Sequence, residues 1–167
     1  KQHFDSTILN QLERNGQFYG LPLASYAWGF YYNKHLFEQL ELSPPKTWQE
    51  FLSVSQALHL QGIKPLIQAN ESNWETLIWL DFLSLQSGGE TLRQQLTSGS
   101  EIDKAVATAL LQPLTFLVQK DYFFAPEHEW VWVQAVAAVA RGLAGMTLTG
   151  QFAEESIADI LDDKIGF

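Results

Sequence analysis

The 167-residue sequence contains no cysteine and few basic residues. Without cysteine it can form neither a disulfide bridge nor a thiolate metal site, and this absence is compatible with both reducing and oxidising compartments. Ten lysines and arginines stand against 19 aspartates and glutamates, which gives a formal charge of -9. Because nucleic-acid binding depends on clustered Lys and Arg, and the basic residues here are dispersed, the composition argues against a nucleic-acid partner.

Long apolar runs are also missing, since charged and polar residues interrupt the hydrophobic ones at short intervals. A transmembrane helix needs roughly 20 consecutive apolar residues, so the sequence predicts a soluble chain. Residues 1–5 lack the charged-then-apolar layout of a secretory signal. We therefore expect any targeting segment to have been removed or to lie outside this sequence. The length suits one compact domain, covering residues 1–167.

The signatures of common enzyme sites are absent as well. There is no nucleophile elbow, no phosphate-binding glycine loop and no dinucleotide fingerprint. The histidines are far apart and have no partner at ligand spacing, so neither a metal nor another cofactor is predicted. Hydrolysis of a glycoside by two carboxylates stays open as an alternative, because acidic residues distant in sequence can converge in space. The histidines are His3, His35, His59 and His128.

The residues that are present predict an α/β fold with a small sheet flanked by helices. Thr47 and Glu50 have the spacing of a capping box, which predicts the start of a helix at this point. A short first helix is expected to begin at Asp5 or Ser6 and to end at Asn15-Gly16. Further helices are predicted at about 33–40, 74–85, 91–96, 103–120, 130–141 and 153–161, and strands at about 17–22, 28–32, 64–68, 143–148 and 164–167.

Four segments of the sequence match a known series of motifs. Residues 18–22 read Phe-Tyr-Gly-Leu-Pro, residues 29–37 read Gly-Phe-Tyr-Tyr-Asn-Lys-His-Leu-Phe, and residues 44–51 read Pro-Pro-Lys-Thr-Trp-Gln-Glu-Phe. Residues 142–152 end in Gly-Gln-Phe, where Phe152 takes the place of an aromatic residue that is usually Trp. In this order and at this spacing, the segments resemble those of the carbohydrate-type extracytoplasmic solute-binding proteins of ABC importers, the maltose-binding-protein-like family.

The resemblance implies a periplasmic-binding-protein-like fold, in which two α/β lobes close around a sugar and the closed form docks on an ABC permease. It implies that this chain is the main segment of the C-terminal lobe and presents half of the ligand cleft, the N-terminal lobe lying outside it. Such a protein is no enzyme, is periplasmic or otherwise extracytoplasmic, and meets the membrane only through the permease. An alternative is a sensory module that presents its solute to a membrane receptor or kinase.

The candidate ligand-binding residues follow from the resemblance and from the chemistry of sugars. A pyranose presents apolar C–H faces to aromatic rings and hydroxyls to planar polar groups. Each aromatic candidate could instead belong to the core, and each polar one could cap a helix or face solvent. Trp130 and Trp132 lie two apart in an apolar helix and cannot share a face, so one of them is expected to be exposed or at a lobe edge. The candidates are Trp74 with Glu71 and Asn73, Phe152 with Gln151, and Tyr26 and Trp28.

Overall fold

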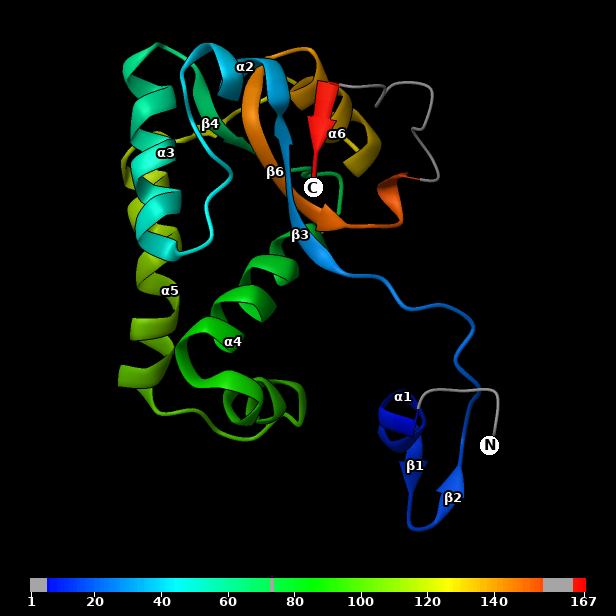
Figure 1. Cartoon of the computed structure of the whole chain (residues 1–167). Helices are drawn as coiled ribbons and strands as arrows, with labels where there is room; N and C mark the ends of the chain where they lie inside the picture. Colours follow the sequence, from blue (N-terminus) through cyan, green and yellow to red (C-terminus); the bar gives the residue numbers. More distant parts are fainter. Residues whose placement is uncertain (1–5, 73, 155–163) are drawn as a thin grey trace.

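The computed structural model in Figure 1 describes residues 6–72, 74–154 and 164–167. At its centre lies a five-stranded mixed sheet made of β3 (Trp28–Asn33), β4 (Lys64–Ile67), β5 (Phe123–Phe124), β6 (Ala144–Gly150) and β7 (Ile165–Gly166). The strand order is β5-β4-β6-β3-β7. Strand β4 runs parallel to β5 and β6, whereas β3 runs antiparallel to β6 and β7.

Helices cover both faces of this sheet, which confirms the predicted α/β class (Figure 1). The neighbouring residues Phe30 and Tyr31 of β3 pack into different core clusters, because successive side chains of a strand point to opposite faces. The cluster around Tyr31 is closed by α6, and the cluster around Phe30 by α3 and α4. The helices are α2 (Lys34–Gln39), α3 (Trp48–Leu60), α4 (Trp74–Thr97), α5 (Lys104–Gln119) and α6 (Trp132–Ala140).

Strand β6 is the most enclosed element of the sheet, and all of its residues are buried. It lies between β3 and β4 and has helices above and below, which explains its apolar and small residues. Gly145 lets α3 approach the strand closely, since a Cβ at this position would lie 2.5 Å from Leu58 Cδ1. The packing of α3 on the sheet therefore depends on this small residue.

Local capping signals determine where α2 and α3 begin. The Thr47 hydroxyl accepts a hydrogen bond from the Glu50 backbone N–H at 3.2 Å, as the capping-box spacing predicts. The Glu50 carboxylate reaches back one residue further than expected and accepts from the Lys46 N–H at 2.7 Å. Asn33 caps α2 in the same manner, accepting from the Leu36 N–H at 2.9 Å.

Helix α4 is bent back on itself at Gly89, which has φ 61° and ψ -157°. This left-handed backbone is accessible to glycine and costly for other residues. The two helices predicted for this region, at about 74–85 and 91–96, are therefore the two arms of α4. Helix α5 follows, capped by the Asp103 carboxylate, which accepts from the Ala105 N–H at 2.8 Å.

The N-terminal part differs from the prediction. Helix α1 (Ser6–Gln11) ends before Asn15-Gly16, so the predicted role of this dipeptide as a helix stop is wrong. Both residues have positive φ, 54° and 78°, and form the turn of a hairpin between β1 (Glu13–Arg14) and β2 (Gln17–Phe18). The strand predicted at 17–22 is confined to Gln17–Phe18, because within the described residues no second strand pairs with the segment after Phe18. Figure 1 shows this hairpin set apart from the main sheet.

Two helix predictions near the C-terminal end have different outcomes. Helix α6 begins at Trp132, two residues later than predicted. The helix predicted at 153–161 falls mostly on residues outside the described part of the chain. The strand predicted at 164–167 is present as the shorter β7. Among the helices in the described ranges, none has the length and hydropathy needed to cross a membrane.

Candidate functional site

Five aromatic residues meet at one end of the central sheet and form the aromatic cluster: Tyr26, Trp28, Trp74, Trp132 and Phe152. The topology explains the convergence. Strand β3 begins where the antiparallel β6 ends, with Trp28 paired to Gly150. Helix α4 follows the parallel strand β4, and α6 precedes β6, so both helices begin at this same end. The carboxyl ends of parallel strands are a common place for ligand sites in α/β folds.

Phe152 lies at the centre of the aromatic cluster. Its ring centroid is 5.1 Å from that of Trp132, 5.6 Å from Trp28, 5.8 Å from Tyr26 and 6.5 Å from Trp74. The rings of Tyr26, Trp28 and Trp132 meet it at 80–88°, the edge-to-face arrangement that the aromatic quadrupole favours. Trp28 and Trp74 lie 6.3 Å apart. The structure thus joins the four aromatic candidates named from the sequence.

The rings of the aromatic cluster combine protein packing with an accessible surface. Trp28 is 49% exposed and Tyr26 is 42% exposed. Trp74, Trp132 and Phe152 are partly buried. Trp74 and Trp132 also pack against the two core clusters, so their orientation is fixed from behind. Fixed rings with an open face are suited to stacking on a flat apolar ligand surface.

Gln151 is held at the edge of the aromatic cluster by its backbone. Its N–H donates to the Ala27 carbonyl at 2.8 Å, and its carbonyl accepts from the Tyr31 hydroxyl at 3.4 Å. The residue itself is exposed. This anchoring leaves the side-chain amide available to a ligand.

The phenol of Tyr31 below Gln151 provides a prediction on pH dependence. Burial, assisted by the nearby Glu154 carboxylate, raises the pKa of Tyr31 to about 12. The unfolded chain, with an ordinary tyrosine pKa of about 10, loses this proton first, so the free energy of unfolding falls as the pH rises above about 10. Tyr31→Phe should remove this component, which urea unfolding of both proteins between about pH 8 and pH 11 measures. Identical slopes would contradict the assignment.

The loop that carries Glu71 is hydrogen-bonded to the segment before α6. The backbone N–H groups of Asn70 and Glu71 both donate to the Trp130 carbonyl, at 3.0 and 3.2 Å. The Asn70 side chain accepts from the Trp130 N–H at 2.8 Å. The Glu71 side chain is exposed. Asn73, the other polar candidate of this loop, lies outside the described residues.

Trp132 is the member of the aromatic cluster that the sequence analysis did not select. Trp130 and Trp132 have different partners: Trp130 packs on Phe124 at 5.8 Å and Trp132 on Phe152. Trp130 precedes α6, which begins at Trp132, so the two do not belong to one helix as predicted. Neither is exposed, since both are partly buried, and the placement of one of them at a lobe edge stays a prediction.

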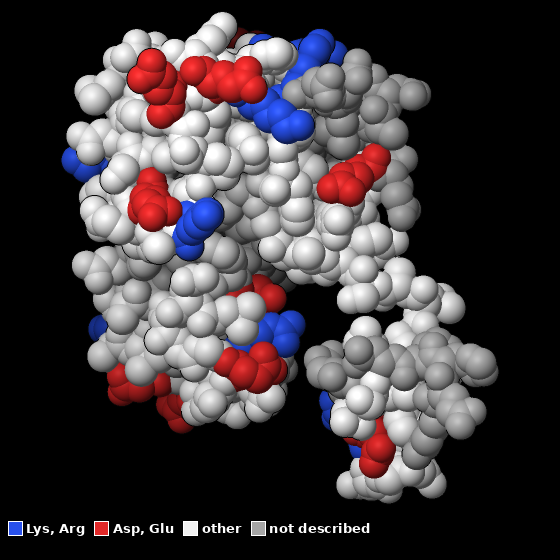
Figure 2. Space-filling model, in the orientation of Figure 1, with Lys and Arg blue, Asp and Glu red and all other residues white. Residues whose placement is uncertain are grey.

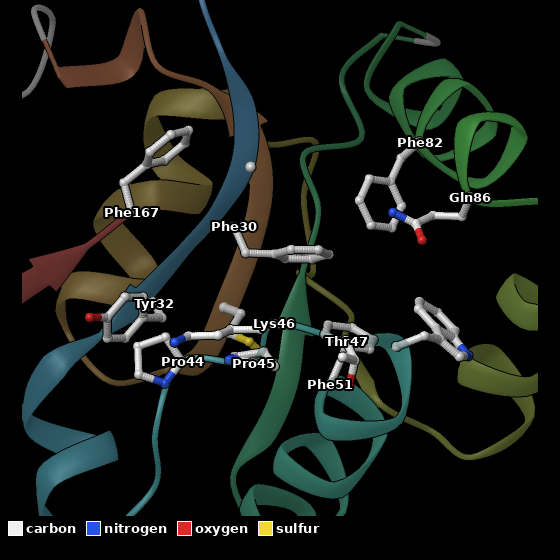
Figure 3. A pocket seen from close by; sticks show the side chains of 13 residues that line it. Phe30, Tyr32, Pro44, Pro45, Lys46, Thr47, Phe51, Phe82, Gln86 and Phe167 are labelled. Carbon is white, nitrogen blue, oxygen red and sulfur yellow. The ribbon is translucent and has the colours of Figure 1, made fainter. Parts of the chain in front are cut away.

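A separate cavity of about 330 Å³ lies further along β3 and contains no residue of the aromatic cluster (Figure 3). Phe30, Tyr32, Phe51, Phe82 and the adjacent prolines give it a mainly apolar wall, as the close-up shows. Its polar lining comes from isolated side chains such as Lys46 and Gln86. We therefore place the candidate functional site at the aromatic cluster.

The face of the molecule in Figure 2 carries acidic and basic side chains scattered singly or in small groups. On this face the described residues form no broad basic patch, in line with the composition. The exposed residues at the edge of the aromatic cluster include an amide, Gln151, and a carboxylate, Glu71.

Comparison with known proteins places the chain in a family. Bacterial extracellular solute-binding proteins match it over residues 2–166. The chain belongs to this family. The resemblance identified from the four sequence motifs is therefore confirmed, and with it the classification among the binding proteins of ABC transporters.

Several relatives of this solute-binding chain are known. An uncharacterized ABC transporter extracellular-binding protein of Pyrococcus horikoshii is 29% identical over 161 residues, which is 93% of this chain and 37% of that protein. A multiple sugar-binding protein of Streptococcus mutans is 31% identical over 72 residues, 43% of this chain and 17% of that protein. The family and the Pyrococcus relative are described as extracellular binding proteins, which indicates an extracytoplasmic location for this family member.

Solved structures share the fold of the solute-binding chain. A chitin oligosaccharide binding protein has a TM-score of 0.80 and 25% identity, over 95% of this chain and 41% of that one. A protein studied for xylan utilization by the thermophilic Caldanaerobius polysaccharolyticus has a TM-score of 0.83 at 22% identity, over 98% and 43%. The chain thus spans about two fifths of the length of these relatives, 37% and 41% for the first of each kind.

Proposed function

We propose that this chain is one lobe of a two-lobed solute-binding protein that binds a carbohydrate between its lobes and delivers it to an ABC permease. The observation that carries the proposal is the convergence of Tyr26, Trp28, Trp74 and Phe152 at one end of the sheet. The names of relatives support it, since they include a multiple sugar-binding protein and a chitin oligosaccharide binding protein.

The proposed binding mode follows from the chemistry of the cluster. The rings of Trp28, Tyr26 and Trp74 stack on the C–H faces of a pyranose, with Trp28 and Tyr26 the most exposed of the described cluster rings. Gln151 and Glu71 lie at the edges, where an amide and a carboxylate can serve sugar hydroxyls. We assign Asn73 the same role from its place in the Glu71 loop. The mode is reversible binding without turnover, so the protein is not an enzyme.

Residues 1–167 are, in this proposal, the main segment of the C-terminal lobe. The facing lobe supplies the remaining contacts and, on closing, removes water from the sugar. Hydrogen bonds to the hydroxyls are strengthened when water is excluded. The permease recognises the closed form of the protein.

The test is thermal unfolding of the two-lobed protein with a panel of mono- and oligosaccharides. A ligand that binds only the folded state at about 100 times its Kd adds roughly 2.7 kcal/mol to the free energy of unfolding, so Tm should rise by several degrees. The panel contains galactose, xylose, N-acetylglucosamine and their oligomers, with amino acids as controls. A rise with amino acids alone, or release of sugar products in a hydrolysis assay, would overturn the proposal.

A second experiment compares the single lobe with the two-lobed protein. Titration calorimetry of residues 1–167 alone should give much weaker binding than the two-lobed protein, because half of the contacts and the closure are missing. Equal affinity would overturn the half-cleft arrangement and leave sugar binding intact.

A further inference from the structure

A groove of about 510 Å³ continues from the aromatic cluster along α4. Trp28 and Trp74 belong to both, so the groove and the cluster share a wall. The groove also contains Asp81 of the first arm of α4 and Arg93 and Thr97 of the second. Its volume lies within the roughly 300–1,000 Å³ that small-molecule sites occupy.

The groove exists because α4 folds back at Gly89. Arg93 then reaches Asp81, twelve positions earlier in the chain, and the Nε–Oδ1 distance is 2.7 Å. Beneath the two arms, Leu83 and Leu92 are buried together with Leu110 of α5. The apolar contact and the ion pair together hold the two arms of α4 at a fixed separation, so the groove is formed before any ligand arrives.

The Asp81–Arg93 pair has hydrogen-bonding capacity that the protein leaves unused. Within the described ranges, the guanidinium makes a single hydrogen bond, from its Nε. Its Nη1 is 3.8 Å from the Glu90 carboxylate, which is beyond hydrogen-bonding distance. Arginine carries five N–H donors, so those on the terminal nitrogens are free. Both side chains are about two-fifths exposed, 42% and 40%, and are therefore accessible from the groove.

The chemistry of this pair selects the class of ligand. The planar guanidinium donates hydrogen bonds and the neighbouring carboxylate accepts them. The pair can therefore bind adjacent hydroxyl groups, each of which both donates and accepts. The two charges compensate each other, which suits a neutral ligand better than a uronate or a phosphate. Trp28 and Trp74 line the same groove and supply an apolar surface beside the pair, with Trp74 about two helical turns before Asp81 on the first arm of α4. Aromatic rings next to polar groups are the combination that a pyranose requires.

We propose that this groove is a second pyranose subsite, in which Asp81 and Arg93 bind hydroxyls of a sugar unit joined to the one held at the aromatic cluster. This inference rests on the proposed carbohydrate-binding function and extends it, because it makes the ligand an oligosaccharide of at least two units. Trp28 and Trp74 lie at the boundary between the two units, so one contiguous surface serves both.

The test compares sugars of increasing length on the two-lobed protein by titration calorimetry. Two series serve as probes: xylose, xylobiose and xylotriose; and galactose, melibiose and raffinose. In the series that binds, affinity should rise about tenfold or more from the first member to the second, since hydrogen bonds to charged groups are strong. Arg93→Gln should remove most of this gain while leaving monosaccharide affinity within about twofold.

Control variants separate recognition from structure. Lys64→Gln removes the distant Lys64–Asp121 ion pair and should not change the affinity for any probe. Asp81→Asn keeps the shape of its side chain and should also reduce the disaccharide gain. Thermal unfolding of each variant without sugar reports any damage to α4.

The outcomes distinguish the subsite from the function on which it rests. If Arg93→Gln lowers mono- and disaccharide affinity equally, the pair only supports Trp74 and the subsite is overturned. If wild-type protein binds mono- and disaccharide equally well, the subsite is overturned and carbohydrate binding stands. If no sugar of any kind binds, the proposed function fails and the subsite fails with it.

Discussion

Trp74→Ala in the two-lobed protein is expected to weaken sugar binding by about 1–3 kcal/mol, which is roughly 5- to 150-fold in Kd. Trp74 opens α4, contacts both Trp28 and Phe152, and lines the adjoining groove. Its removal takes away one of the rings proposed to stack on the sugar. Titration calorimetry with the sugar identified by thermal shift gives the change in Kd.

Trp48→Ala is the matched control for this prediction. Trp48 is also a partly buried tryptophan at the start of a helix, but it stacks on Phe51 at 5.0 Å and lines the cavity of Figure 3. Its loss should lower Tm and leave Kd unchanged. If Trp74→Ala instead lowers only Tm, as Trp48→Ala does, Trp74 is a core residue and the binding site lies elsewhere.

The elements that the sequence predicts well are those whose signals are local. Thr47 and Asn33 each cap a helix through a backbone N–H three residues later, so the relevant atoms lie within one turn. Gly89 likewise interrupts α4 through its own backbone conformation. Such signals act before any tertiary contact, and the predicted boundaries therefore agree closely with the structure.

The elements predicted poorly depend on partners elsewhere in the chain. Asn15-Gly16 is equally suited to ending a helix and to turning a hairpin, because both need positive φ. The outcome is decided by the pairing of β1 with β2. The strand expected at 17–22 shows the same dependence: an aromatic-rich segment becomes a strand only beside another strand, and in the part of the chain that the structure describes none lies beside the residues past Phe18.

The residues of the candidate site were likewise predictable only in part. The aromatic members Trp74, Phe152, Tyr26 and Trp28 were predicted through the family resemblance, and residue types alone did not predict that they meet. Their convergence follows from the register of β3 on β6, which places Trp28 opposite Gly150. The Asp81–Arg93 pair was missed because it forms across the Gly89 turn, where helical i, i+4 spacing no longer indicates which side chains are neighbours.

The largest loss of stability is expected for Leu58→Ala, by about 2–5 kcal/mol, because Leu58 is fully buried and its removal leaves a cavity beneath the sheet. The Leu58 side chain packs closely on the backbone of β6 at Gly145. Because backbone shifts less easily than a side chain, the cavity left by the mutation can close only in part. Leu60→Ala removes the same atoms from the same helix at a position that is 74% exposed, and should change stability by no more than about 0.5 kcal/mol. Urea unfolding of both variants, followed by circular dichroism, gives the two free energies. Similar losses for the two would show that α3 does not pack on β6 through this face.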